Sequence, residues 1–220
     1  MFKKLLFVIS LYFSLFVFAA NPFIELTNTS SMELVKHIDA DPTSFNNALA
    51  MNIPYGPILE IRKRIEEKLG LKLKFLTAWQ IEGEAHITTI TPPEFVNSLS
   101  THISMKRIHE IAENENIQFA DLKFLGVGSG KKLINGKEEQ TFFIIVDSFK
   151  LREIRFKIYQ EFIKNGGDAH AFDPTWFFPH ITIGYTLRDL HEPDVLKNMK
   201  HSLDKRFSLL NNNLFTLNQK

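Results

Sequence analysis

The feature that most constrains the fold is a repeated tripeptide, which occurs as His86-Ile87-Thr88 and again as His180-Ile181-Thr182. Each copy lies in a short apolar run rich in β-branched residues, and such runs favour strands. Alternate residues of a strand point to the same face. Each strand is therefore expected to present one imidazole and one hydroxyl side by side, above an apolar face that anchors it. Two such strands brought together would form a cleft with two histidines and two threonines.

Local signals around the two motifs predict further helices and strands. Apolar periodicity and capping residues predict helices over 42–51 after Asp41, from Ile58 to Leu69, from Thr91, over 105–112, from Ser148 to Gly166, and from Pro193. Extended structure is predicted over 71–90 with a break at Glu82-Gly83, over 120–128, over 140–147, and from Trp176 to Tyr185. Asn135-Gly136 is a strong signal for a tight hairpin turn.

The helix-and-strand grouping occurs twice, once with each motif, and 94 residues separate the two motif histidines. We therefore expect a pseudo-symmetric α+β architecture, in which two lobes face each other across a cleft.

The first 20 residues have the pattern of a secretory signal peptide. Lys3 and Lys4 precede an uncharged apolar run over 5–18, and the small residues Ala19 and Ala20 follow. The run is shorter than the ~20 residues that a membrane-spanning helix needs. We expect residues 1–20 to be removed and residues 21–220 to form a single two-lobed domain. The mature protein is then expected to be a monomer, periplasmic or secreted, without stable membrane association.

Charge and composition narrow the classes of partner. Without residues 1–20 the chain has 24 basic and 25 acidic residues, which gives a net charge of −1. A near-neutral chain does not offer a broad surface for nucleic acid or anionic membranes, so phosphate recognition has to be local. The chain contains no cysteine, which excludes a thiol nucleophile and a thiolate metal site.

The motif residues suit phosphodiester cleavage by water. Imidazole acts as a general acid or a general base near neutral pH, because its unperturbed pKa is about 6.5. His86 and His180 are therefore candidate catalytic residues that divide the two proton transfers. The hydroxyls of Thr88 and Thr182 are candidate ligands for the non-bridging phosphate oxygens. Which histidine is the acid stays open at this point.

The paired motifs resemble the signatures of the 2H phosphoesterase superfamily, which includes 2′-5′ RNA ligase-like proteins and cyclic phosphodiesterases. Its signature is two copies of His, an apolar residue, Ser or Thr, and usually another apolar residue. Thr89 departs from this pattern in the first copy. The resemblance covers about residues 55–207. It implies antiparallel sheets around a central cleft with helices outside, and catalysis by the two histidines without a metal or a cofactor.

The same residues also allow interpretations without a catalytic role. A His-Thr strand is often only a half-buried polar face, and a two-histidine metal site lacks the third ligand that zinc requires. Glu84 shares a face with His86 and is interpreted as a strand-edge surface residue. A solvated surface position is expected for the remaining histidines, which are His37, His102, His109, His170, His191 and His201.

Two further stretches invite a functional interpretation. Residues 126–131 look like a phosphate loop but lack its spacing, so a flexible turn of the hairpin is predicted. Trp176-Phe177-Phe178 could stack on a base, although aromatic residues on a strand usually belong to the core. Tyr185 is a weak candidate, because it lies on the strand face opposite His180.

The sequence thus predicts an exported, metal-independent phosphodiesterase. Its substrate would be a nucleotide or a short oligonucleotide with a 2′,3′-cyclic or a 2′-5′ phosphodiester. The alternative is a non-catalytic module that binds a nucleotide or phosphate in the same cleft. The presence of all four motif residues favours the enzyme, since binding alone has less need of two opposed acid-base groups.

Overall fold

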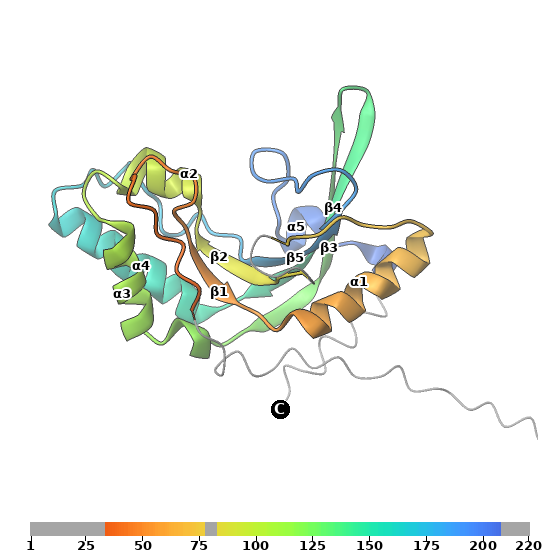
Figure 1. The fold of residues 1–220 in the computed structure, drawn as a ribbon, viewed down its shortest axis with the longest axis horizontal. Coiled ribbons are helices and arrows are strands. Elements are labelled where there is room, and N and C mark those ends of the chain that lie inside the picture. Colours follow the sequence, from red (N-terminus) through yellow and green to blue (C-terminus); the bar gives the residue numbers. More distant parts are fainter. Residues whose placement is uncertain (1–33, 78–82, 208–220) are drawn as a thin grey trace, which may run out of the picture.

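The structure is a computed structural model, and it describes residues 34–77 and 83–207 (Figure 1). The predicted signal peptide and Glu82 lie outside these residues. The chain forms an α+β fold with two small antiparallel sheets, which confirms the predicted fold class. One sheet pairs β1 (Leu49–Asn52) with β2 (His86–Ile90), and the other has the order β3 (Lys123–Ile134), β4 (Lys137–Asp147), β5 (His180–Tyr185). Among the described helices, none has the length and apolar character that a bilayer crossing requires.

The two long helices pack crosswise. α1 (Tyr55–Leu69) precedes β2 in the chain but packs against β5, whereas α4 (Phe149–Lys164) precedes β5 but packs against β2. They lie at opposite sides of the sheets in Figure 1, and α3 (Met105–Asn114) packs beside α4. β2 and β5 also contact each other, so the two strands that carry the motifs are neighbours at the junction of the sheets.

A single cluster of buried apolar side chains contains residues of both sheets and of α1, α3 and α4. Its members on the motif strands and the long helices include Ile58, Ile61, Ile65, Ile87, Ile154, Ile158, Ile181 and Ile183. The isoleucines of both motifs therefore occupy the apolar strand face that alternation predicts. The histidine and threonine of each motif are left on the other face.

Local sequence signals set several element ends as predicted. α1 ends at Gly70, whose φ of 66° is the left-handed conformation typical of a helix terminus. Ser148 caps α4, and its hydroxyl accepts a hydrogen bond from the backbone N–H of Leu151. Asn135 and Gly136 both have positive φ, at 50° and 77°, as a tight hairpin turn between β3 and β4 requires.

The predicted helix over 42–51 is wrong. Asp41 does not cap a helix but accepts hydrogen bonds from the backbone and the hydroxyl of Thr43, which makes a turn. The residues that follow form β1, since their backbone groups pair with β2. Pairing with a strand distant in the sequence therefore overrides the local helix signal.

The predicted helix from Pro193 is also wrong in extent. Only Met199–Ser202 forms a helix, α5, which Asn198 caps, while the residues before it form a loop that follows β5. The second motif strand begins at His180 and not at Trp176. Residues 126–131 lie within β3 and are not a turn, with Gly126 at a bulge.

The remaining short elements are α2 (Pro92–Glu94), the π-helical turn Phe95–Leu99 that continues it, and the 3₁₀ turns Ile117–Phe119 and Lys205–Phe207. α2 begins with a capping box, in which the Thr91 hydroxyl accepts from the Glu94 N–H and the Glu94 carboxylate accepts from the Thr91 N–H. This box ends β2 just beyond the first motif.

Candidate active site

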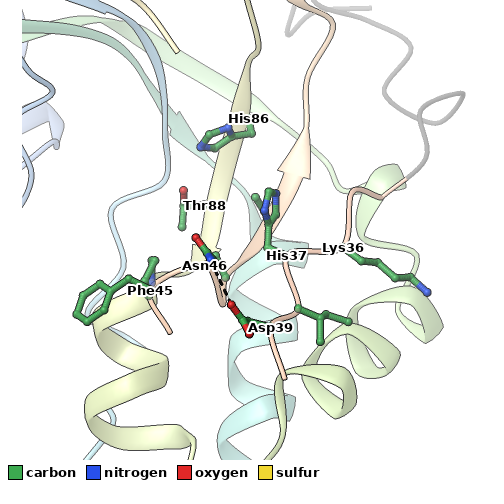
Figure 2. A pocket seen from close by; sticks show the side chains of 11 residues that line it. Lys36, His37, Asp39, Phe45, Asn46, His86 and Thr88 are labelled. Atoms are coloured by element: carbon green, nitrogen blue, oxygen red, sulfur yellow. Dashed lines mark hydrogen bonds between the residues drawn. The ribbon is translucent and has the colours of Figure 1, made fainter. Parts of the chain in front are cut away.

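The first motif lines a cavity of about 520 Å³. His86 and Thr88 both face it from β2, as the strand parity predicts (Figure 2). Its volume lies in the ~300–1,000 Å³ range of small-molecule sites. Glu84 is not a surface residue as expected: its side chain is buried, and its carboxylate oxygen lies 3.5 Å from Nδ1 of His86. A carboxylate therefore accompanies the first imidazole.

The other wall of this cavity comes from the segment before β1. His37, Asp39, Phe45 and Asn46 contribute to it, and Figure 2 shows His37 and Asn46 beside the strand that carries His86. The segment pairs with the start of the first sheet, because the backbone N–H of Ala48 donates to the His37 carbonyl. The cavity thus joins the first motif to a stretch of chain far from it in the sequence.

Two histidines near this wall are not solvated as expected. His37 is half-buried, and burial together with the neighbouring His86 and His109 lowers its pKa to about 4. His109 on α3 is fully buried, and its Nε2–H donates to the carbonyl of Ala48 at 2.9 Å. Burial lowers the pKa of His109 as well. Both rings are therefore neutral near pH 7.

The second motif lies in a different environment. Nδ1 of His180 is 2.9 Å from the carbonyl of Phe178, and Nε2 is 3.1 Å from the ammonium of Lys197. A carbonyl only accepts and an ammonium only donates, so Nδ1 carries the hydrogen and Nε2 presents its lone pair. Burial and the nearby charge of Lys197 hold the pKa of His180 down at about 3. His180 is therefore neutral over the physiological range of pH.

Asp189 connects the members of this second cluster. Its carboxylate accepts from Thr141 at 2.6 Å, from Thr182 at 3.0 Å and from Lys197 at 3.0 Å. Burial alone would raise the pKa of Asp189, but the charges of Lys197 and His191 and the bond from Thr141 outweigh it and hold the pKa at about 2. The hydroxyl hydrogen of Thr182 thus points to Asp189 in this arrangement.

The aromatic residues before the second motif divide between core and surface. Phe177 is buried, as the core interpretation predicts, but Trp176 is exposed and its ring lies edge-on to Phe178 at 4.9 Å. The indole N–H of Trp176 donates to the carboxylate of Glu192. Tyr185 lies at the end of β5, and its hydroxyl is directed to the carbonyl of Phe75.

Arg155 links the surroundings of the two motifs. This α4 residue is buried, and its guanidinium donates to the carbonyl of Thr89 at 2.7 Å and to the carboxylate of Glu94 at 2.8 Å. It also donates to backbone carbonyls of the loop before β5, at Pro174, Asp173 and Trp176. One side chain therefore fixes the end of β2 and the approach to β5 together.

The structure brings each histidine to its own threonine, and the two motif strands are neighbours. His180 and Thr182 are not among the residues that line the cavity described above. That the two imidazoles oppose each other across one cleft stays a prediction. Within 34–77 and 83–207, no group of three or more His, Asp or Glu side chains is arranged to hold a metal ion.

Sequence reasoning missed Asp189 and Lys197 and misplaced Glu84. Glu84 carried a usable signal, because it stands two residues before His86 on the same strand face. Asp189 and Lys197 carried none, since they belong to a loop whose path depends on contacts distant in the sequence. No sequence pattern relates His37 to His86, so its place beside the first motif could not be predicted either.

Two antiparallel sheets that each present a His-x-Thr strand define a phosphoesterase of the two-histidine class. A family model described as "Swiss Army Knife, 2H phosphoesterase domain" matches residues 47–191. The chain belongs to this family, which confirms the resemblance and supports phosphoesterase activity in general. No curated protein and no solved structure matches the chain. The matched range contains both motifs and Asp189, but it excludes the segment with His37 and ends before Lys197.

Proposed function

We propose that the protein is an exported, metal-independent phosphodiesterase that hydrolyses a 2′,3′-cyclic or 2′-5′ phosphodiester of a nucleotide or short oligonucleotide. The observation that carries this proposal is the opposite charge beside the two motif histidines. His86 lies beside the carboxylate of Glu84, whereas His180 accepts from the ammonium of Lys197. The ammonium and the burial keep His180 neutral, so it presents the lone pair of Nε2, whereas the carboxylate of Glu84 stands beside Nδ1 of His86. The two rings are thus suited to different proton transfers.

In this proposal His180 is the general base and His86 the general acid. Nε2 of His180 takes a proton from water as the water oxygen forms a bond to phosphorus. The bond from phosphorus to the departing ribose oxygen breaks, and His86 gives that oxygen a proton. The product is a phosphomonoester with a free hydroxyl. Thr88 and Thr182 would bind the non-bridging oxygens, for which the Thr182 hydroxyl has to turn away from Asp189.

The size of the cavity supports a small substrate. A volume of about 520 Å³ suits a nucleotide better than a long polymer. Lys36 and Asp39 both line the cavity, and the ammonium of Lys36 pairs with Glu113 at 2.9 Å. We propose that the protein acts as a monomer outside the cytoplasm. N-terminal mass spectrometry of protein from the extracellular or periplasmic fraction should then find a chain that starts near Ala20 or Asn21.

Turnover of a panel of 2′,3′-cyclic and 2′-5′-linked nucleotides, with and without chelator, tests the activity. His86→Ala and His180→Ala should each lower kcat by ~10²- to 10⁴-fold, the usual contribution of a positioned acid or base. Thr88→Val and Thr182→Val should cost ~10- to 10²-fold, because each removes one hydrogen bond to a charged oxygen. His170→Ala, at an exposed position, is the control.

Three outcomes would contradict the proposal. If both histidine variants kept wild-type rates, the site assignment would be wrong. If the wild-type protein bound a nucleotide tightly but converted none of the panel, the non-catalytic binding module would replace the enzyme. Loss of turnover with chelator, restored by a divalent cation, would refute the metal-independent mechanism.

A further inference from the structure

Lys197 is an ammonium group held inside the protein. Its side chain is 3% exposed, although lysine is normally a surface residue. It lies in the loop between β5 and α5, beyond the part of the chain that matches the family model. Burial lowers the pKa of Lys197, and the ion pair with Asp189 opposes this effect. Burying a charge costs free energy unless the charge is paired. A buried ammonium beside a candidate catalytic histidine therefore suggests a functional role.

The loop that carries Lys197 is fixed in the residues just before it. Glu192 accepts from the indole of Trp176, and Asp194 pairs with Arg188 at 2.7 Å. Val195 packs directly over Gly130 of β3. Lys197 therefore approaches His180 from a defined backbone position and not from a flexible arm.

We propose that Lys197 is a further functional residue of the phosphodiesterase site: its ammonium covers Nε2 of His180 before substrate binds and then turns to a non-bridging oxygen of the bound phosphodiester. This inference rests on the proposed function, in which His180 is the general base. The ammonium has three N–H groups, of which one reaches Asp189 and one reaches His180. Asp189 is the fixed partner in both positions.

The exchange follows from the strength of the two acceptors. Both bonds have an ionised donor, but a phosphodiester oxygen is anionic and adds Coulomb attraction to the ammonium that the neutral imidazole lacks. It therefore competes well with a neutral imidazole for the same N–H. When the ammonium turns, the lone pair of Nε2 becomes available to the attacking water. The base is thus exposed only when a phosphodiester is present, and the positive charge is delivered to the oxygens that gain negative charge.

The ammonium of Lys197 also compensates the negative charge beside the second motif, so that an anionic phosphate can bind there. Asp189 accepts from the Thr182 hydroxyl, so its carboxylate stands next to the expected phosphate position. Without Lys197 this carboxylate would repel a phosphodiester. The pair of Lys197 and Asp189 removes the net negative charge while it keeps Thr182 and Thr141 in place.

Nitrogen NMR of the histidine rings tests the contact without requiring turnover. In the wild-type protein, Nε2 of His180 should remain unprotonated down to about pH 4, because burial and then the charge of Lys197 lower the pKa of this ring. The charge of Asp189 acts in the opposite direction, and His191 adds weakly to the lowering. Addition of inorganic phosphate or a 3′-nucleotide should shift that Nε2 resonance. In Lys197→Met the ring should titrate at higher pH and phosphate should no longer shift it. Lys200→Met, an exposed lysine three residues on, should behave as wild type.

Kinetics supply the second readout. For Lys197→Met we expect a ~10- to 10²-fold loss in kcat/KM. The acidic limb of its pH profile should move to higher pH by about one unit or more, because the base is easier to protonate once the ammonium is gone. Lys197→Arg should recover part of the binding but not the profile, since a planar guanidinium has a different geometry.

The outcomes separate this inference from the proposed function. If Lys197→Met does not fold, Lys197→Gln, which keeps N–H groups for Asp189 but has no charge, takes its place in each measurement. An unchanged His180 titration in the folded variant overturns the role of Lys197, whether or not the protein has activity. A protein without turnover in which phosphate still shifts the His180 resonance through Lys197 would contradict only the proposed reaction.

Discussion

At the scale of the residue, the wall of the cavity depends on one buried amide. The Asn47 side chain is fully buried, and it donates to the carbonyls of Asp41 and Ser44 at 2.8 and 3.2 Å and accepts from the N–H of Asp39 at 2.8 Å. It therefore holds the turn that follows His37. A segment without regular secondary structure is shaped here by side chain to backbone bonds.

Asn47→Ala should destabilise the protein by about 2–3 kcal/mol, because it removes three side chain to backbone hydrogen bonds that shape the turn. Urea unfolding monitored by circular dichroism measures this loss. Asn46→Ala, at the exposed neighbouring position, should cost under ~0.5 kcal/mol. Equal stability of the two variants would show that the turn forms without the buried amide.

Single residues were predictable from the sequence where the repeat identifies them. His86, Thr88, His180 and Thr182 follow from the tripeptide, and their pairing within each strand follows from alternation. The electrostatic partners were not predictable in the same way. Lys197 is 17 residues from His180, and no local pattern requires a loop to return there.

At the scale of the element, the loop after β5 is positioned by a glycine on β3. A Cβ added at Gly130 would lie 2.4 Å from both γ carbons of Val195 and 2.9 Å from its Cβ. The backbone of the loop would have to move to make room for it. The close contact between hairpin and loop therefore depends on the absence of a side chain at this position.

Gly130→Ala should cost about 1–3 kcal/mol of stability, as overpacking of a tight contact does. Gly56→Ala is the matched control, because an added Cβ there meets nothing within 4 Å in the first turn of α1. The control should be neutral or stabilising by up to ~1 kcal/mol. Thermal unfolding of both variants measures the difference, and a neutral Gly130→Ala would show that the loop adapts freely.

Elements with strong local signals were predictable, and those set by long-range contacts were not. α1, α3 and α4 have apolar periodicity and capping residues, and the hairpin has its Asn-Gly turn. β1 was predicted as helix, because its strand character comes from pairing with β2. The residues between Pro193 and α5 look helical by periodicity, but they form the loop packed on β3.

At the scale of the whole molecule, buried histidines make stability depend on pH. The pKa values of His180 and His37 are about 3 and about 4 in the folded protein, against ~6.5 in an unfolded chain. As pH falls through ~6.5, the unfolded chain binds protons that the folded protein does not. The free energy of unfolding should therefore decrease from about pH 7 to about pH 5, before most carboxylates titrate.

Urea unfolding at several pH values in this window checks the expectation. His180→Gln should reduce the slope by at most about 1.4 kcal/mol per pH unit, since one proton is removed from the linkage. His170→Gln, at an exposed position, should keep the wild-type slope. A pH-independent free energy of unfolding in the wild-type protein would contradict the lowered pKa values.

The bonds of Arg155 have a consequence for how the molecule opens. Its guanidinium joins the end of β2 to the loop before β5, and the apolar cluster beneath is shared by both sheets. Neither motif strand can separate from the rest without breaking bonds that also hold the other. In hydrogen exchange, the amides of the two strands should consequently belong to one cooperative unit with a common opening free energy. Local unfolding of one motif strand alone is therefore suppressed. The two histidines are either both held in place or both released.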